Sequence, residues 1–260
     1  MRAYKAARAT HARMDHDWET RRCAAVRPVR ERAMTDVRPD APETAPDLPE
    51  SKLTATKQKW AREGRFLTGR VARTGEDRLP PGQHLVKDWP VLDLGLQPEV
   101  PLNAWALDVD GLVAHPAHWD WSAFKAQPQS DLVTDIHCVT TWSRYDNRWD
   151  GLLTRDLMAM VEPLPSARFV VMHSYDGYTT NVPIEDFAAE DALLAHSWEG
   201  QPLTRAHGGP VRVVIPHLYF WKSAKWVKRI EFIPADRLGF WEVRGYHERG
   251  DPWTEQRYSE

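Results

Sequence analysis

Runs of β-branched and aromatic residues, separated by Gly and Pro, constrain the fold of this 260-residue chain more than any other feature. Such residues favour strands, and Gly or Pro between the runs favours turns. The runs lie at residues 105–111, 132–138, 168–173, 177–182, 211–216 and 226–233. Helical patterns are fewer and short, at residues 120–126, 154–161 and 183–189. Because strands and helices do not alternate regularly, we expect an α+β fold that is mainly β, with mixed sheets and short helices.

One hairpin can be placed more closely. Residues 105–111 end in Asp110-Gly111, a turn dipeptide, so residues 112–116 are expected to return as the second strand. His115 and His118 lie close to this second strand. Two imidazoles without further ligands at a familiar spacing are insufficient for a zinc site, and solvated histidines at a hairpin end are the favoured interpretation.

The N-terminal third differs in composition from the rest. Residues 1–33 are basic, and from Met34 the chain turns to Asp, Glu and Pro, which bury too little apolar surface to offset the entropy of ordering. We expect residues 1–50 to be a disordered extension, with translation starting either at residue 1 or at Met34. Residues 51–84 are expected to form a polar helix and an arm, and residues 85–260 the folded domain.

Charge and cysteine content exclude several classes of protein. A net charge of −3 provides no basic surplus for binding nucleic acid. No apolar run is long enough for a membrane span. The two cysteines, Cys23 and Cys138, form neither a CxxC pair nor a disulfide framework, which favours a reducing, cytoplasmic location.

Cys138 is the strongest single candidate for chemistry. It follows His137 at the end of an expected strand, and a polar and aromatic segment comes after it. A thiolate there could bind a metal or attack carbon. A thiol hydrolase would use Cys138 with His137 or His173 as base, although neighbouring residues on a strand point to opposite faces. The 13 tryptophans leave open a third interpretation, a non-catalytic β domain that binds a ligand through aromatic side chains.

Four blocks of sequence carry a more specific signal. They are the Cys138 block His-Cys-Val-Thr-Thr-Trp-Ser, residues 176–183 (Asp-Gly-Tyr-Thr-Thr-Asn-Val-Pro), residues 207–212 (His-Gly-Gly-Pro-Val-Arg) and the tail at residues 239–253. In this order they resemble the molybdopterin-binding domain of the sulfite oxidase family, most closely its small soluble bacterial members. The resemblance runs from about residue 85 to the end, and it implies the sulfite oxidase-type fold and a molybdenum-molybdopterin cofactor.

The resemblance also implies roles for individual residues. Cys138 matches the cysteine that binds molybdenum, and a soft thiolate suits such a centre. Tyr178, five residues before Pro183, matches a tyrosine that faces the metal-bound oxygen, and it could orient substrate or relay a proton. Independently of the resemblance, Arg144 is a nearby cation that would help to keep Cys138 a thiolate. The residues that match contacts to the cofactor and its terminal phosphate are His207, Arg212, Ser223, Ala224 and Lys225, with His173 and Ser174 near a further cleft position.

The implied reaction is a two-electron transfer of an oxygen atom to or from a small substrate, an oxyanion, sulfoxide or N-oxide. An arginine cluster that holds sulfite in true sulfite oxidases is absent after Cys138, so sulfite is not assumed as the substrate. The chain has no room for a haem domain, and electrons are expected to pass to a separate partner. The basic run at residues 222–229 is either a solvated strand end or part of the phosphate-binding loop.

Overall fold

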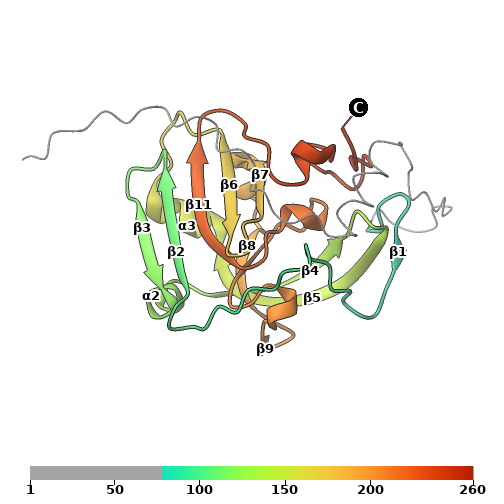
Figure 1. The fold of residues 1–260 in the computed structure, drawn as a ribbon, viewed down its shortest axis with the longest axis horizontal. Coiled ribbons are helices and arrows are strands. Elements are labelled where there is room, and N and C mark those ends of the chain that lie inside the picture. The colour runs from blue at the N-terminus through green and yellow to red at the C-terminus, as the bar shows by residue number, and fades with distance from the viewer. Residues whose placement is uncertain (1–77, 260) are drawn as a thin grey trace, which may run out of the picture. The chain divides into compact units, whose positions relative to one another are not determined.

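The computed structural model of the protein describes residues 78–259. The strands in this part form two mixed sheets, and the chain also forms a few short helices (Figure 1). This arrangement confirms the expected α+β, mainly β fold. The expectations for residues 1–50, for the helix at 51–64 and for Met34 lie outside the described residues.

The first sheet has the strand order β1-β5-β8-β10, with β4 paired to β5 and β9 paired to β8. Strand β1 runs parallel to β5, and the other pairs are antiparallel. The strands of this sheet are β1 (His84–Leu85), β4 (Ser130–His137), β5 (Trp142–Leu153), β8 (Leu193–Trp198), β9 (Gln201–Pro202) and β10 (Arg212–Val214).

The second sheet has the order β3-β2-β11-β6-β7. Strands β2 and β11 run parallel, and the remaining pairs are antiparallel. The strands of this sheet are β2 (Ala106–Gly111), β3 (Ala117–Asp120), β6 (Phe169–Ser174), β7 (Thr179–Pro183) and β11 (Val227–Ile233).

The helices lie close to their expected positions. Helix α3 is amphipathic, with Leu157 and Val161 buried, and it ends where Glu162 takes a left-handed conformation (φ 49°) before Pro163. The α-helices are α2 (Trp121–Ala126), α3 (Thr154–Val161) and α4 (Ile184–Phe187); the 3-10 turns are η1 (Arg205–His207), η2 (Phe220–Lys222) and η3 (Glu242–Arg244).

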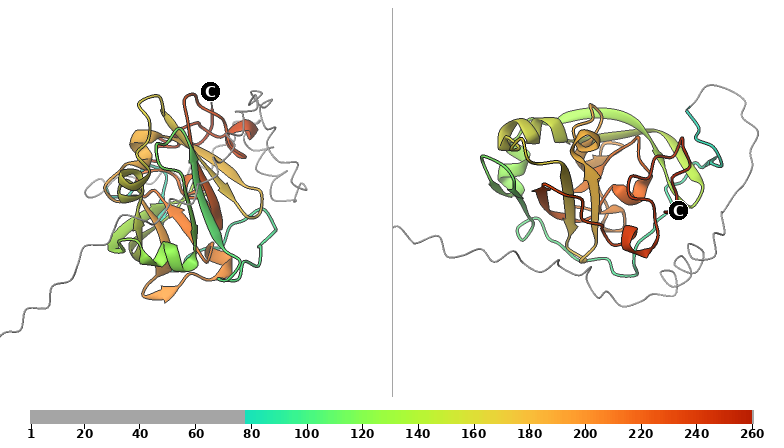
Figure 2. Two further views of the ribbon diagram at one scale, coloured as in Figure 1. Left: turned by 90° about the vertical axis from the view of Figure 1, so that its left-hand side faces the viewer. Right: turned by 90° about the horizontal axis from the view of Figure 1, so that it is seen from above.

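Strand β5 was not predicted from the sequence, and neither was β8. Polar residues interrupt the apolar pattern of β5, but Trp142 and Trp149 are buried, and buried Asn147 donates to the Thr134 carbonyl of β4 (3.1 Å). These contacts let a polar segment continue the sheet. The antiparallel β4–β5 hairpin therefore places Cys138 and the following residues in the turn between the two strands. The length and curvature of β5 are visible in yellow-green in Figure 2.

The predicted hairpin at residues 105–116 needs a correction. The strand that returns along β2 is β3, not residues 112–116. Gly111 belongs to β2, with φ +84°, and a Cβ on it would lie 2.2 Å from the Phe232 carbonyl oxygen of β11. Glycine is therefore needed here for the close approach of two parallel strands rather than for a hairpin turn. His115 and His118 have exposed side chains, as expected.

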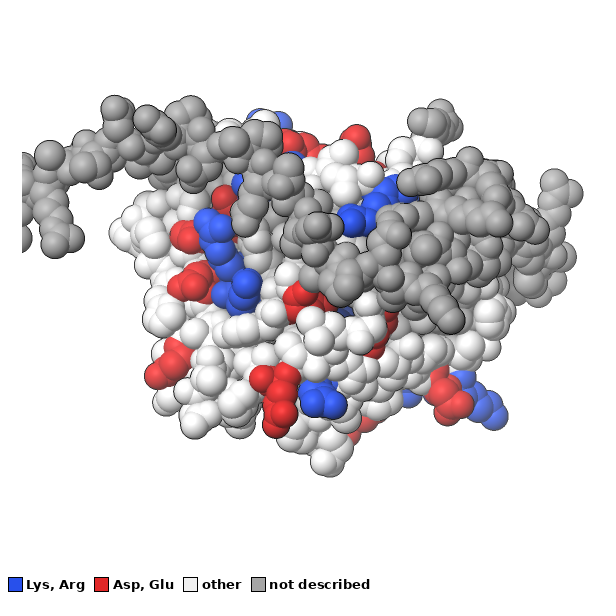
Figure 3. All heavy atoms as spheres, in the orientation of Figure 1, with Lys and Arg blue, Asp and Glu red and all other residues white. Residues whose placement is uncertain are grey.

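A hydrophobic core draws on both sheets. It includes Val109 and Phe232 of the second sheet and Trp149 and Leu194 of the first, all fully buried. On the face in Figure 3, acidic and basic side chains are intermixed, and the described residues of that face form no large patch of one sign. Within residues 78–259, no helix is long and apolar enough to cross a membrane.

Candidate functional site

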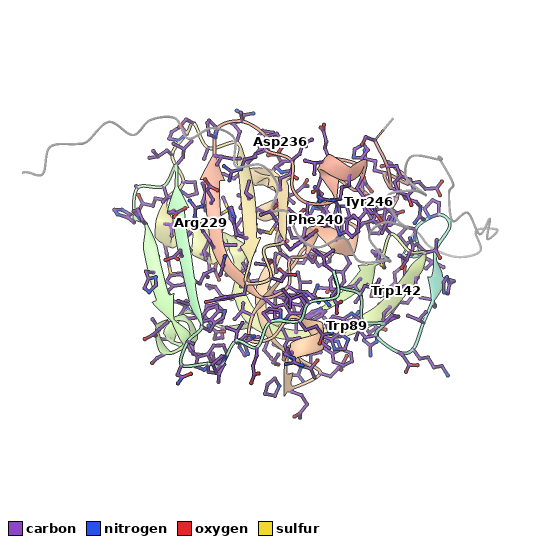
Figure 4. All side chains as sticks on the ribbon, viewed as in Figure 1. Trp89, Trp142, Arg229, Asp236, Phe240 and Tyr246 are labelled. Carbon is purple, nitrogen blue, oxygen red and sulfur yellow. The ribbon has the colours of Figure 1, made fainter. Side chains whose placement is uncertain are left out.

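A cavity of about 800 Å³ of empty space, its open mouth included, draws its walls from several distant segments. The arm around Trp89 and Asp93, the turn after β4 with Cys138, and the segment that follows β6 all contribute. Further residues come from the stretch around η1 and η2 and from the C-terminal segment. In Figure 4, Trp89 and Trp142 lie on one side of this region, and Phe240 and Tyr246 on the other.

The cysteine turn is closed by its own backbone. The Cys138 N–H donates to the Trp142 carbonyl (2.8 Å), and the Thr141 N–H donates to the Cys138 carbonyl (3.0 Å). Thr141 has φ 78°, a left-handed conformation that a β-branched residue seldom adopts. Cys138 is 6% exposed and lines the cavity. A tight, hydrogen-bonded turn thus holds the Cys138 sulfur at the cavity.

Two buried side chains hold this turn. The Gln83 Nε2 donates to the Cys138 carbonyl (3.1 Å), and the Arg257 guanidinium donates to the Val139 carbonyl (2.7 Å). Gln83 is 1% exposed and Arg257 is 3% exposed. Both contacts come from segments far away in the sequence. The position of the sulfur therefore depends on tertiary structure and not on the β4–β5 hairpin alone.

Arg212 forms a cationic wall of the cavity. Its guanidinium donates to the carbonyls of His207 (3.0 Å) and Ser223 (2.9 Å) and lies 4.1 Å from the centre of the Phe220 ring. Burial lowers the Arg212 pKa to about 9. Among residues 78–259 no carboxylate forms an ion pair with it. A buried cation without a counter-ion is suited to an anionic ligand.

Lys225 is the second cation of the wall. Its Nζ donates to the Ala206 carbonyl (2.7 Å), and burial, followed by the charge of Arg212, lowers the Lys225 pKa to about 7. Gly208 makes this approach possible, because a Cβ there would lie 2.9 Å from the Lys225 Cβ. Arg212 and Lys225 thus place two basic groups in one cavity. Asp93 and Asp176 act on Lys225 through their charge, but neither forms a direct ion pair with it among the described residues.

His207 stacks on Trp89 with 3.9 Å between ring centres. Its Nε2 lies 3.2 Å from the Trp89 carbonyl, and burial lowers the His207 pKa. On another wall, Asp176 accepts from the Tyr178 backbone N–H (3.0 Å), and burial raises the Asp176 pKa to about 6. The cavity therefore brings together groups that change charge near neutral pH.

The aromatic side of the cavity is fixed by buried hydrogen bonds. The Tyr178 hydroxyl donates to the Trp221 carbonyl (2.6 Å), and burial raises the Tyr178 pKa well above its ordinary value. The indole of Trp221 donates to Glu242 Oε1 (3.0 Å) and lies edge-on to Tyr246, with 5.1 Å between ring centres. Tyr178 is therefore a neutral, buried phenol and not a surface residue.

A buried ion pair lies behind this wall. Lys222 Nζ and Glu242 Oε1 are 2.6 Å apart, and both side chains are fully buried. Lys222 also donates to the Asn181 carbonyl (2.8 Å), and Glu242 accepts from the Thr180 hydroxyl (2.9 Å). The solvated strand end considered for residues 222–229 is therefore wrong for Lys222.

Most of the residues predicted for the site do meet in the cavity. Those that line it are Cys138, Ser174, Tyr178, His207, Arg212, Ser223 and Lys225. Ala224 is buried next to them, and its carbonyl accepts from the Val213 N–H (2.8 Å). Asp176, Trp89 and Asp93 are not among the residues to which the sequence resemblance gave an individual role. Only packing shows that these residues reach the cavity.

Besides Ala224, two predicted residues do not line the cavity. The Arg144 guanidinium donates to the Lys87 carbonyl (3.1 Å) and lies over Trp198, 4.7 Å from the ring centre. His173 pairs with Glu231 (2.9 Å), because successive residues of β6 point to opposite faces and Ser174 takes the cavity side.

The histidines proposed as bases for a thiol hydrolase are also absent from the cavity lining. His137 is buried against the Ser143 hydroxyl (2.9 Å), and burial lowers its pKa to about 4. His173 is held by Glu231. Neither imidazole shares the cavity with Cys138, so the geometry does not favour a hydrolase.

The groups in the cavity fit a cofactor that brings its own metal ligands and an anionic end. The described residues contain no group of three or more His, Cys, Asp or Glu that could hold a metal ion. Cys138 would therefore be a single protein ligand. Arg212 and Lys225 suit a phosphate. Buried Trp142 Nε1 and Ser174 Oγ, on two lining residues, have no hydrogen-bond partner in the described structure, and thus remain available to a ligand.

Comparisons with known proteins agree with this fit. The family model for the oxidoreductase molybdopterin binding domain matches residues 95–241. The chain is 46% identical over 183 residues to the uncharacterized oxidoreductase YuiH of Bacillus subtilis, covering 70% of this chain and 92% of that protein.

More distant relatives are larger proteins. The protein-methionine-sulfoxide reductase catalytic subunit MsrP of Ralstonia nicotianae is 28% identical over 164 residues, 57% of this chain and 49% of that one. This chain thus spans about half the length of that relative. The sulfane dehydrogenase SoxCD of Paracoccus pantotrophus superposes with a TM-score of 0.48 and 19% identity over 54% of this chain and 40% of that chain.

Proposed function

This chain belongs to the oxidoreductase molybdopterin-binding family and is a molybdopterin-dependent enzyme, and from this premise we propose that it transfers an oxygen atom to or from a small substrate. Cys138 would be the protein ligand of molybdenum. The observation that carries the proposal is that the Cys138 thiol lines one cavity with two basic groups, Arg212 and Lys225, which form no direct ion pair within residues 78–259.

Each wall of the cavity has a role in this proposal. Arg212 and Lys225 would hold the cofactor phosphate, with Ser223 and the stacked His207–Trp89 pair beside it. When bound, the molybdenum cofactor supplies two-electron redox chemistry, and the protein supplies binding, orientation and electrostatics. Tyr178, kept protonated by burial, lines the same cavity and would orient substrate.

The charges in the cavity favour an uncharged substrate. Its cationic lining side chains are Arg212 and Lys225, and both are assigned to the cofactor. A dianion such as sulfite would therefore lack a counter-ion of its own. A sulfoxide or N-oxide needs only a hydrogen-bond donor and apolar contact. The indole N–H of Trp142 would be the donor, and the aromatic lining side chains would supply the apolar contact. The name of the MsrP relative, a methionine-sulfoxide reductase, points in the same direction.

Electrons would be exchanged with a separate partner protein. From the cysteine content we propose a cytoplasmic location, which cell fractionation would test. The main test uses protein made in a host that synthesises molybdopterin. We expect about one molybdenum and one pterin per chain in the wild type. Cys138→Ser should lose the metal–thiolate absorption. Arg212→Met should reduce pterin content, whereas Arg148→Met, at an exposed arginine, should not.

Reduction of methionine sulfoxide, dimethyl sulfoxide and trimethylamine N-oxide, with sulfite oxidation measured in parallel, would then identify the substrate class. Wild-type protein without molybdenum from such a host would refute the proposal. Activity on sulfite alone would refute the preference for an uncharged substrate while leaving the cofactor assignment intact.

A further inference from the structure

The hydroxyl of Thr140 contacts the sulfur of Cys138. The Thr140 Oγ1 and the Cys138 Sγ are 3.1 Å apart, within hydrogen-bond distance for sulfur. We infer that Thr140 is a positioning residue whose hydroxyl donates to the Cys138 sulfur and raises the reduction potential of the molybdenum bound there. This inference rests on the proposed role of Cys138 as metal ligand.

The direction of this hydrogen bond follows from the chemistry of a metal-bound cysteine. A thiol and a hydroxyl can each donate to the other, but a metal ligand is a thiolate and has no proton to give. In the loaded protein the hydroxyl of Thr140 must therefore be the donor. Thr140 is half-buried and is not among the cavity-lining residues, so its hydroxyl approaches the sulfur from within the turn.

The turn leaves this hydroxyl little freedom. Thr141, the next residue, is held in its left-handed conformation while the backbone bonds between Cys138 and Trp142 close the turn. Gln83 and Arg257 hold the carbonyls of Cys138 and Val139, the two residues that precede Thr140. A strained backbone conformation persists only where the surroundings over-determine it. The contact between Thr140 and the sulfur is therefore part of a fixed geometry.

Hydrogen bonds to a ligating sulfur tune the metal that it binds. A donor withdraws electron density from the thiolate, so less charge reaches the metal. The more reduced metal, with its larger share of negative charge on sulfur, is stabilised most. Loss of the hydroxyl should therefore lower the reduction potential. It should also raise the sulfur donor orbital and shift the sulfur-to-metal charge-transfer absorption to lower energy.

The test compares Thr140→Val, which removes the hydroxyl at nearly constant shape, with Thr140→Ser, which keeps it. Each holoenzyme is titrated electrochemically, and its absorption spectrum and molybdenum content are recorded. We expect Thr140→Val to shift the one-electron equilibrium toward the oxidised metal by about tenfold, which corresponds to about 59 mV. Thr140→Ser should restore the wild-type potential. Thr254→Val, the same change at an exposed position, should have no effect.

Several outcomes would overturn the inference. One is a Thr140→Val protein that contains molybdenum and has the wild-type potential and spectrum. Another is a Thr140→Ser protein that behaves like Thr140→Val. If Thr140→Val fails to take up metal, the hydrogen bond can be tested in the wild-type holoenzyme instead. Its metal–sulfur stretching frequency should shift when the protein is transferred from H2O to D2O. No shift would refute the hydrogen bond. Wild type without a metal–thiolate absorption would instead refute the role of Cys138.

Discussion

Breaking the buried pair of Lys222 and Glu242 should cost a large part of the stability of the domain. In Lys222→Met, Glu242 keeps the hydroxyl of Thr180 and the indole of Trp221 as donors, but it loses its only ion-pair partner among the described residues. A buried charge left without its partner typically costs about 3–5 kcal/mol. Because a domain has about 5–15 kcal/mol of stability in total, the effect should be easy to measure.

Urea unfolding of the cofactor-free protein is the assay, since a tightly bound cofactor would prevent two-state analysis. Arg148→Met breaks an exposed ion pair with Asp131 and is the matched control, expected to change the unfolding free energy by about 1 kcal/mol or less. The double variant Lys222→Met with Glu242→Leu should be destabilised by less than the sum of the single variants, because it leaves no unpaired charge. A loss of less than 1 kcal/mol in Lys222→Met, or additive effects in the double variant, would refute this reasoning.

Further predictions concern packing and pH. In Gly151→Ala the new Cβ would lie 2.2 Å from the Leu194 carbonyl oxygen, so the free energy of unfolding should fall by more than about 3 kcal/mol. Gly200→Ala is the control, because it has open space around it but a φ of +71°, and it should lose about 1 kcal/mol. Similar losses in the two variants would contradict the close approach of β5 and β8. Burial, followed by Lys125, lowers the His196 pKa to about 4. Between pH 6.5 and pH 4 the unfolded chain binds a proton that the folded chain does not, so stability should fall as pH falls through this range. His196→Gln should flatten this dependence in urea midpoints measured at pH 7 and pH 5, and an unchanged slope would contradict it.

The strands with a continuous apolar pattern could be predicted from the sequence, and β6 and β11 show why. Both are central strands of the second sheet. Their apolar residues, which alternate or run continuously, are mostly the buried ones, so the sequence pattern alone indicates a strand. Strand β5 could not be predicted in this way. Contacts with β4 and β8 stabilise its polar residues in the sheet, and one of them is the hydrogen bond from Asn147 to the Thr134 carbonyl. Only the tertiary structure reveals these contacts.

The candidate site likewise contains residues that could be predicted from the sequence and residues that could not. Cys138, His207, Arg212 and Lys225 stand in motifs that the resemblance identifies, and all four line the cavity. Arg144 was assigned to the site by its closeness to Cys138 in sequence, yet the geometry of β5 directs it toward Trp198 and away from the cavity lining. Closeness along a strand is a poor guide to a shared site, since alternate residues face opposite sides. The contact of Arg257 with the cysteine turn has no local sequence signal at all.

That contact bears on the order of events during synthesis. The turn that presents Cys138 is held in part by Arg257, which lies 118 residues further along the chain than Val139. Chains emerge from the ribosome starting at the N-terminus, so the cysteine leaves the ribosome well before this arginine does. A nascent chain cannot complete the turn before Arg257 has emerged, and the finished geometry of the sulfur is available only from that point on. Insertion of a metal cofactor at this position would therefore follow the emergence of Arg257 and act on a chain already folded around this arginine.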